Sequence, residues 1–190
     1  PIGIVWMIGR SLNTKHFWAR RPKLEEAQAL VEVAPEKELL ELAVAIRDEG
    51  YGSLVTYSPK VFVPLTELCR DVCHYCTFAK RPRQLSNVYL AESQVLEIAE
   101  KGVSAGCHEV LFTLGDKPEL RYRAAREALD ALGYESTIDY LCAMAGRVVD
   151  QTGLLPHINA GILSADQMTA LKEVSVSQGI MLESGSARLA

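Results

Sequence analysis

The sequence predicts an α/β protein in which short apolar strands alternate with amphipathic helices. Two observations lead to this prediction: brief apolar, β-branched runs recur along the chain, and between them apolar residues return at helical spacing. Strands separated by helices pair in parallel, because right-handed crossovers return the chain to the same sheet. With 190 residues and 48% hydrophobic content, the chain can bury a core. We therefore expect part of a (β/α) barrel, with about four parallel strands.

Each predicted element has its own signal in the sequence. A first helix is expected over residues 36–48, where apolar side chains share one face. Strands are expected, in chain order, at residues 60–65, 108–114, 156–162 and 178–183. Three of the intervening helices are expected to end at glycines, namely Gly106, Gly133 and Gly153. Ser164 and Gln167 form a capping box ahead of the last helix.

Three cysteines lie within eight residues of one another directly after the first predicted strand: Cys69, Cys73 and Cys76. Thiolates this close on an irregular loop can converge on one soft metal centre. A 4Fe-4S cluster has four iron corners, so three protein ligands leave one iron open to bind and activate a small molecule. We interpret the spacing as that of an iron-sulfur cluster site.

A structural zinc site is the alternative interpretation of these cysteines, with His74 or Cys107 as the fourth ligand. Zinc sites usually combine one cysteine pair with a second pair further along, and the sequence has no second pair. The odd total of five cysteines disfavours a set of disulfides. Cys107 and Cys142 lie outside the motif and are expected in the core, because free cysteine behaves as a small apolar residue.

The segments around the cysteines resemble a known family. They are similar to the FO synthase family of radical S-adenosylmethionine (SAM) enzymes, which form the chromophore 7,8-didemethyl-8-hydroxy-5-deazariboflavin. The match is to its cyclising subunit or to the N-terminal half of the fused enzyme. The matching blocks are the cysteine loop and residues 55–66, 77–79, 111–119, 153–159 and 179–183. The resemblance therefore covers residues 50–190 and implies a barrel of the radical SAM type.

The resemblance also implies a division of the chain. Residues 1–50 are expected to form an N-terminal extension with a helix, and residues 51–190 the N-terminal part of the radical SAM domain. Four strands cannot close a (β/α)8 barrel, which takes about 250 residues. We therefore expect the chain to be a fragment of the catalytic domain, whose activity on its own is in doubt.

The reaction implied by the resemblance is a radical cyclisation by a lyase, with a 4Fe-4S cluster and SAM as cofactors. Its substrate is an adduct of a hydroxybenzyl group and a ribitylaminouracil, and ammonia is released. A partner radical SAM subunit or domain would supply the adduct, and a reducing electron carrier would supply the electron. The alternatives are another radical SAM activity, of the futalosine-pathway or biotin-synthase type, and a zinc-stabilised binding module without catalysis.

Five further residues are implied as cofactor contacts by their match to the family. Tyr75 is expected to line the adenine pocket or to pack within the loop. Gly115 and Asp116 are expected to receive the methionine ammonium, although Asp116 is equally suited to cap the next helix. Glu183 is expected to bind ribose hydroxyls or to form a salt bridge in the barrel, and Asn159 is a weaker candidate for the same pocket. The sequence identifies no catalytic side chain.

Charge and hydropathy exclude several classes of partner. A net charge of −4 gives no general attraction to nucleic acid or to anionic lipid. The basic cluster of Lys80, Arg81 and Arg83 is expected to form the solvated exit of the cysteine loop. No stretch reaches the roughly 20 apolar residues that cross a bilayer. Thiols without a secretory pattern indicate a reducing compartment, so we expect a cytoplasmic protein that binds neither membrane nor nucleic acid.

Overall fold

The computed structural model describes residues 23–25, 28, 32, 35–73 and 76–181 and divides into two compact units, Pro1–Tyr57 and Ser58–Ala190. The main described element of the first unit is helix α4 (Glu36–Tyr51), which confirms the predicted helix and continues it beyond residue 48. Gly52 follows with a φ of 60°, a left-handed conformation that glycine adopts without strain and that ends the helix.

The second unit contains one four-stranded parallel sheet with the order β1-β2-β3-β4. Its strands are β1 (Lys60–Val63), β2 (Glu109–Thr113), β3 (Leu155–Asn159) and β4 (Ser177–Gln178). The expected α/β class and the four parallel strands of a partial barrel are confirmed.

The strands are shorter than the sequence predicts. β1 ends before residues 64–65, where Leu65 N–H turns back to the Val63 carbonyl at 3.0 Å. β3 starts one residue earlier than expected and ends at Asn159, because Gly161 takes a φ of 74° and turns the chain. β4 includes only Gln178 of the expected 178–183, and residues 182–183 lie outside the described part.

Helices α5 (Glu92–Ser104), α7 (Thr137–Thr152) and α8 (Ala165–Lys172) follow β1, β2 and β3, and α6 (Arg123–Leu132) precedes α7. Gly133 and Gly153 end α6 and α7 in left-handed conformations, as predicted. The predicted capping box is also present, because Gln167 N–H donates to Ser164 Oγ at 3.2 Å and Ser164 N–H to Gln167 Oε1 at 3.0 Å. Short 3-10 turns, η1 (Pro82–Gln84) and η2 (Pro118–Leu120), complete the unit.

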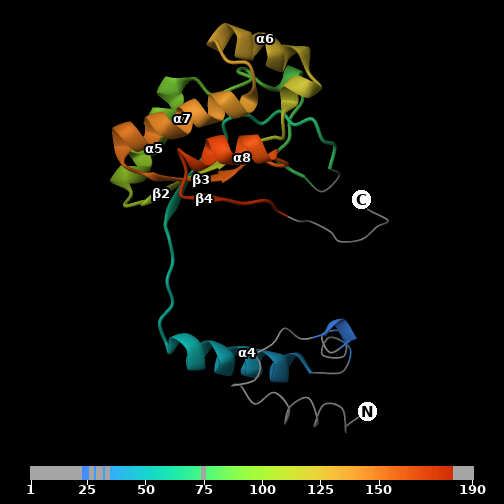
Figure 1. The fold of residues 1–190 in the computed structure, drawn as a ribbon, viewed down its shortest axis with the longest axis vertical. Helices are drawn as coiled ribbons and strands as arrows, with labels where there is room; N and C mark the ends of the chain where they lie inside the picture. The colour runs from blue at the N-terminus through green and yellow to red at the C-terminus, as the bar shows by residue number, and fades with distance from the viewer. Residues whose placement is uncertain (1–22, 26–27, 29–31, 33–34, 74–75, 182–190) are drawn as a thin grey trace. The chain divides into compact units, whose positions relative to one another are not determined.

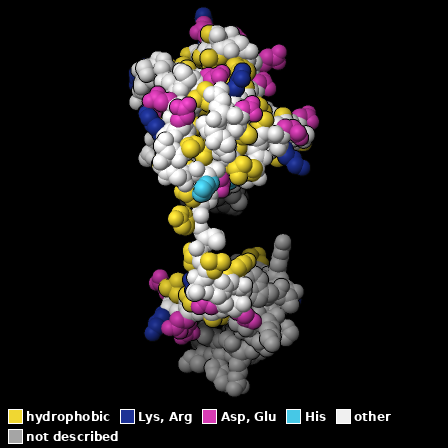
Figure 2. Space-filling model, turned by 90° about the vertical axis from the view of Figure 1, so that its left-hand side faces the viewer, with side chains coloured by type: hydrophobic (Ala, Val, Ile, Leu, Met, Phe, Trp, Pro, Cys, Tyr) yellow, Lys and Arg dark blue, Asp and Glu magenta, His cyan; other side chains and the backbone are white. Residues whose placement is uncertain are grey.

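The core lies between the sheet and helices α5, α7 and α8, which cover the same face of the sheet (Figure 1). Alternate strand residues, Val63, Phe112 and Ile158 among them, point into this layer and are fully buried. On the other face Phe62 is 59% exposed. Figure 2 shows acidic and basic side chains interspersed on the face in view. None of the helices described is long and apolar enough to span a membrane.

A buried polar network joins the segment after β2 to the start of α7. The Thr137 hydroxyl donates to Glu119 Oε2 at 2.6 Å, and the Thr137 N–H donates to Oε1 at 3.2 Å. Tyr89 Oη lies 2.6 Å from the same hydroxyl. Burial raises the pKa of Tyr89, so its hydroxyl stays protonated. These bonds satisfy a carboxylate that would otherwise be costly to bury.

Thr137→Val should therefore destabilise the fold by about 2 to 3 kcal/mol, because Glu119 loses a donor while the side chain keeps its volume. The measurement is the free energy of unfolding in denaturant. Thr169→Val on α8 is the matched control, since its exposed hydroxyl bonds only to the Ala165 carbonyl of the preceding turn. The control should change stability by less than about 0.5 kcal/mol. Equal effects would show that the buried network adds no stability.

Gly115, just after β2, lies directly against the backbone that follows β1. A Cβ built on Gly115 would come within 1.8 Å of the Leu68 carbonyl oxygen and 2.8 Å of Cys69 Cα. The Gly115 N–H donates to the Thr66 carbonyl at 3.1 Å. The two segments can approach this closely only because residue 115 has no side chain.

Gly115→Ala should destabilise the protein by about 3 kcal/mol, because the backbone of residues 68–69 would have to move to accommodate the methyl group. Gly146→Ala is a control for which we expect the opposite change in stability. Gly146 lies inside α7, where a Cβ would meet Val174 Cγ1 at an ordinary 3.7 Å, so alanine should stabilise the helix by up to about 1 kcal/mol. Unfolding curves of both variants test the pair, and a neutral Gly115→Ala would mean that the two segments separate easily.

Candidate metal and cofactor site

The three cysteines of the predicted cluster site lie on one loop that leaves the carboxyl end of β1. This loop is closed at its base, where Leu68 pairs with Lys80 and the Lys80 N–H donates to the Glu67 carbonyl at 2.9 Å. The Lys80 ammonium also pairs with the Glu67 carboxylate at 2.7 Å. Carboxyl ends of parallel strands are where barrel proteins place their functional groups.

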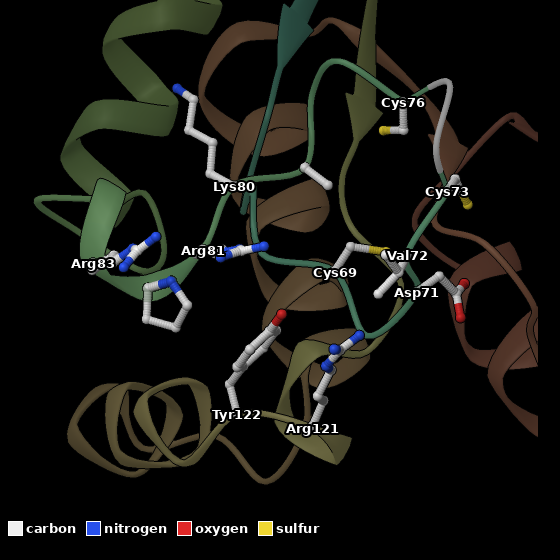
Figure 3. Close-up of a pocket in the computed structure, with 12 residues that line it drawn as sticks. Cys69, Asp71, Val72, Cys73, Cys76, Lys80, Arg81, Arg83, Arg121 and Tyr122 are labelled. Atoms are coloured by element: carbon white, nitrogen blue, oxygen red, sulfur yellow. The ribbon is translucent and has the colours of Figure 1, made fainter.

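All three thiols are free and line the same cavity of about 600 Å³ (Figure 3). Four cationic side chains share the cavity wall: Lys80, Arg81, Arg83 and Arg121. Tyr122 reaches into it from the segment after β2, on the side opposite the cysteine loop. Arg81 and Arg83 are exposed, which agrees with the solvated loop exit predicted from the sequence. The cavity is therefore rich in thiols and positive charge, with Asp71 as its acidic member.

The sulfur atoms do not converge on a point. Cys69 and Cys76 are partly buried, whereas Cys73 is exposed and its sulfur points away from the other two in Figure 3. Among the described residues, which omit 74–75, no three side chains are arranged to hold a metal ion. The donor set nevertheless fits an iron-sulfur cluster, because three soft thiols from one loop face a single cavity.

The structure argues against Cys107, one of the two residues proposed as the fourth ligand of a zinc site. Cys107 precedes β2 and lies beside the start of the sheet, while the cysteine loop leaves the other end of β1. Both Cys107 and Cys142 pack against the core, as expected for free cysteines outside the motif. His74, the other proposed fourth ligand, lies outside the described residues.

Burial raises the pKa of the Cys69 thiol above its ordinary value. Hydrogen bonds from the backbone N–H groups of Asp71 and Asp116 act in the opposite direction but are weaker. Burial likewise raises the pKa of Cys142. Cys69 is therefore a protonated thiol at neutral pH, and loading it with a metal would release that proton.

Asp116 contacts the cysteine loop. Its carboxylate is buried, and Oδ2 accepts a hydrogen bond from Arg70 Nε at 2.8 Å and lies 2.8 Å from Arg70 Nη2 in an ion pair. The expected alternative, a helix cap, is wrong: the next helix, α6, has Tyr122 at its N-cap, and the turn η2 before it has Lys117. Gly115 also lies against the loop, as described above. Their predicted contact with the methionine ammonium stays a prediction.

The structure says less about the three remaining predicted site residues. Asn159 ends β3 beside Thr113 of β2, at the same sheet edge as the cysteine loop, and is partly buried. Tyr75 and Glu183 both lie outside the described residues. Asn159, Tyr75 and Glu183 therefore stay predictions.

Several residues at this edge are missed by the sequence analysis: Arg70, Lys117, Arg121, Tyr122 and Gly161. Arg70 alone had a usable signal, because it lies next to the first cysteine and Asp116 follows the neighbouring strand. Opposite charges at the ends of adjacent parallel strands can be expected to meet. The other four follow irregular segments, whose course the apolar pattern does not determine.

Comparisons with known proteins identify relatives of this chain. FO synthase of Mycobacterium tuberculosis is 48% identical over 161 residues, which cover 77% of this chain and 19% of that protein. FO synthase of Streptomyces avermitilis is 45% identical over 175 residues, covering 86% and 20%. The 7,8-didemethyl-8-hydroxy-5-deazariboflavin synthase of Methanopyrus kandleri is 47% identical over 136 residues, covering 72% and 41%. The chain thus spans a fifth to two fifths of these relatives.

Solved structures agree with the fold. Methylornithine synthase superimposes with a TM-score of 0.61 at 18% identity, over 87% of this chain and 45% of that one. The FeFe-hydrogenase maturase HydG from Carboxydothermus hydrogenoformans gives a TM-score of 0.65 at 20% identity, over 90% and 36%. No protein-family model matches the chain. The chain is therefore homologous to one segment of the FO synthases and has the partial-barrel fold of the radical SAM type that its sequence predicts.

Proposed function

We propose that the protein is the cluster-binding part of a radical SAM enzyme that forms 7,8-didemethyl-8-hydroxy-5-deazariboflavin. The observation that carries this proposal is the placement of Cys69, Cys73 and Cys76 on one cavity at the carboxyl end of β1. Three relatives named for this product are 45%, 47% and 48% identical to most of the chain, which supports the product class.

In this proposal the three thiols hold a 4Fe-4S cluster, and SAM occupies the iron that no cysteine ligates. When bound, this pair supplies the one-electron chemistry that starts a radical reaction. The chain's own residues hold the thiols at one cavity and surround them with cations. Positive side chains such as Arg81 and Arg121 favour any anionic group of a ligand. Tyr75, Asn159 and Glu183 remain our proposed contacts to the adenosyl part of SAM.

The reaction we propose is ring closure of a hydroxybenzyl–ribitylaminouracil adduct with release of ammonia, a lyase reaction. Because the chain spans only part of its relatives, the remaining barrel strands belong to the proposal as well. So do a partner radical SAM subunit or domain that supplies the adduct and a reducing electron carrier. Free thiols suit a reducing compartment, and we place the protein in the cytoplasm.

Replacing Cys69, Cys73 or Cys76 with alanine, one at a time, should abolish stable cluster assembly. Two thiolates on one loop leave two corners of the cluster without a protein ligand. The measurement is iron and sulfide content, with the visible spectrum, after anaerobic reconstitution of the 190-residue chain. We expect about four irons per wild-type chain and less than about one in each variant.

Cys107→Ser and Cys142→Ser are the matched controls, because both residues pack against the core, and their iron content should equal that of the wild type. Full iron content in all three loop variants would refute the cluster site. One zinc ion per wild-type chain, with no visible band, would favour the zinc-stabilised module. A complete parent protein that binds the cluster but does not convert the adduct would favour another radical SAM reaction.

A further inference from the structure

We infer that Arg70 and Asp116 form a brace that fixes Cys69 at the sheet edge, so that Asp116 is a positioning residue and not a ligand of the cofactor ammonium. The inference rests on the proposed function only for the identity of the metal group. The contacts themselves belong to the chain without any cofactor.

The backbone N–H, the backbone carbonyl and one carboxylate oxygen of Asp116 contact the cysteine loop. Its backbone N–H donates to Cys69 Sγ at 3.3 Å. Its carbonyl accepts from the Arg70 N–H at 3.0 Å, and its carboxylate accepts from the Arg70 guanidinium. Residue 116 thus contacts the first cysteine and the residue after it through its N–H, its carbonyl and its side chain.

The brace is anchored on both sides by further cations. Asp116 is 5% exposed, and Lys117 Nζ lies 3.4 Å from its Oδ1. Arg121 Nη1 donates to the Arg70 carbonyl at 2.7 Å, which holds Arg70 from the other side. A carboxylate this buried is stable as a charged group only with such partners, so removing one of them is costly.

A third strand end completes the brace. Gly161, in the turn after β3, packs so closely on Asp116 that a Cβ on the glycine would lie 2.9 Å from the Asp116 Cβ. Lys117 Nζ donates to the Ile162 carbonyl in the same turn. The carboxyl ends of β1, β2 and β3 are therefore tied together around Asp116. Movement of any of the three segments would disturb the N–H to sulfur bond at Cys69.

The same contacts leave Asp116 poorly suited to receive an ammonium group. Arg70 and Lys117 already neutralise the carboxylate, and Gly161 closes off one side of it. An incoming ammonium would have to displace one of these cations. An N–H to sulfur bond, by contrast, is a known means of orienting a metal ligand and tuning the reduction potential of a cluster.

The test measures native-state alkylation of each cysteine in the anaerobic, metal-free chain, by iodoacetamide labelling and peptide mass spectrometry. In the wild type Cys69 should react more slowly than Cys73. Asp116→Asn and Arg70→Gln should each accelerate Cys69 about tenfold and leave Cys73 unchanged within about twofold. The double variant should react no faster than either single variant, because the two residues act through one pair. Glu127→Gln, which removes an exposed ion pair on α6, should change nothing.

The signs of the two changes in the Cys69 alkylation rate, in Asp116→Asn and in Arg70→Gln, distinguish a brace from a purely electrostatic effect on the thiol. Removing the Asp116 charge favours the Cys69 thiolate, whereas removing the Arg70 charge disfavours it. Opposite changes in the Cys69 rate would therefore mean that only charge matters, and they would overturn the inference, as would unchanged rates. Acceleration in both variants supports the brace.

Arg70→Lys is a control for variants that lose the fold, because it keeps the charge but not the guanidinium Nε–H that donates to Asp116. It should accelerate Cys69 by less than Arg70→Gln. If Cys107 and Cys142 become reactive together with Cys69 in every variant, the pair stabilises the whole fold and the inference is wrong.

A second measurement uses the reconstituted protein. At equal iron content, Asp116→Asn should shift the midpoint potential of the cluster, while Glu127→Gln should not. If the midpoint potential did not shift, the pair would position Cys69 only in the metal-free chain, and its proposed role at the cluster would be wrong. A wild-type chain that binds no iron would refute the proposed function but leave the alkylation result intact.

Discussion

The parallel pairing of β1 with β2 is the constraint on which the candidate site depends. Its register aligns Val63 with Phe112, so both strands end at one edge of the sheet. The cysteine loop leaves β1 there, and Gly115 and Asp116 leave β2 beside it. A slip of either strand by one residue would turn its buried side chain, Val63 or Phe112, to the other face of the sheet. Burial of these side chains beneath the helices therefore fixes the relative position of segments that are distant in sequence.

The described parts of the cysteine loop differ in their burial and contacts. Its base is closed by the pairing of Leu68 with Lys80, and Cys69 is partly buried against the segment after β2. Cys73, near the tip, is exposed. Ordering a loop costs conformational entropy, and a metal that draws its ligands together must offset that cost. Because contacts already hold Cys69, less of the loop would have to be ordered if Cys73 and Cys76 converged on a metal.

Apolar spacing was sufficient to predict the helices, the parallel sheet and the loop that carries the cysteines. It was not sufficient to predict where the strands end. Gly161 ends the expected third strand early by adopting a left-handed conformation, and Leu65 turns back onto Val63. The role of Asp116 was also missed, because its partner Arg70 is 46 positions away and only the pairing of the two strands, not a local pattern, links them. Long-range pairing of charges depends on the register of the sheet, which periodicity alone does not give.

The partners of Asp116 decide which chemistry the strand end can offer. A ligand ammonium and the Arg70 guanidinium would compete for the same oxygen, but Arg70 is already part of the chain and loses no translational freedom on binding. The Arg70 Nε–H donates to Oδ2, Nη2 lies 2.8 Å from the same oxygen, and Lys117 is close to Oδ1. A mobile ligand therefore starts at a disadvantage against both cations. At this sheet edge the Asp116 side chain therefore holds the cysteine loop in place, and in our proposal the contacts to a cofactor come from other groups around the cavity.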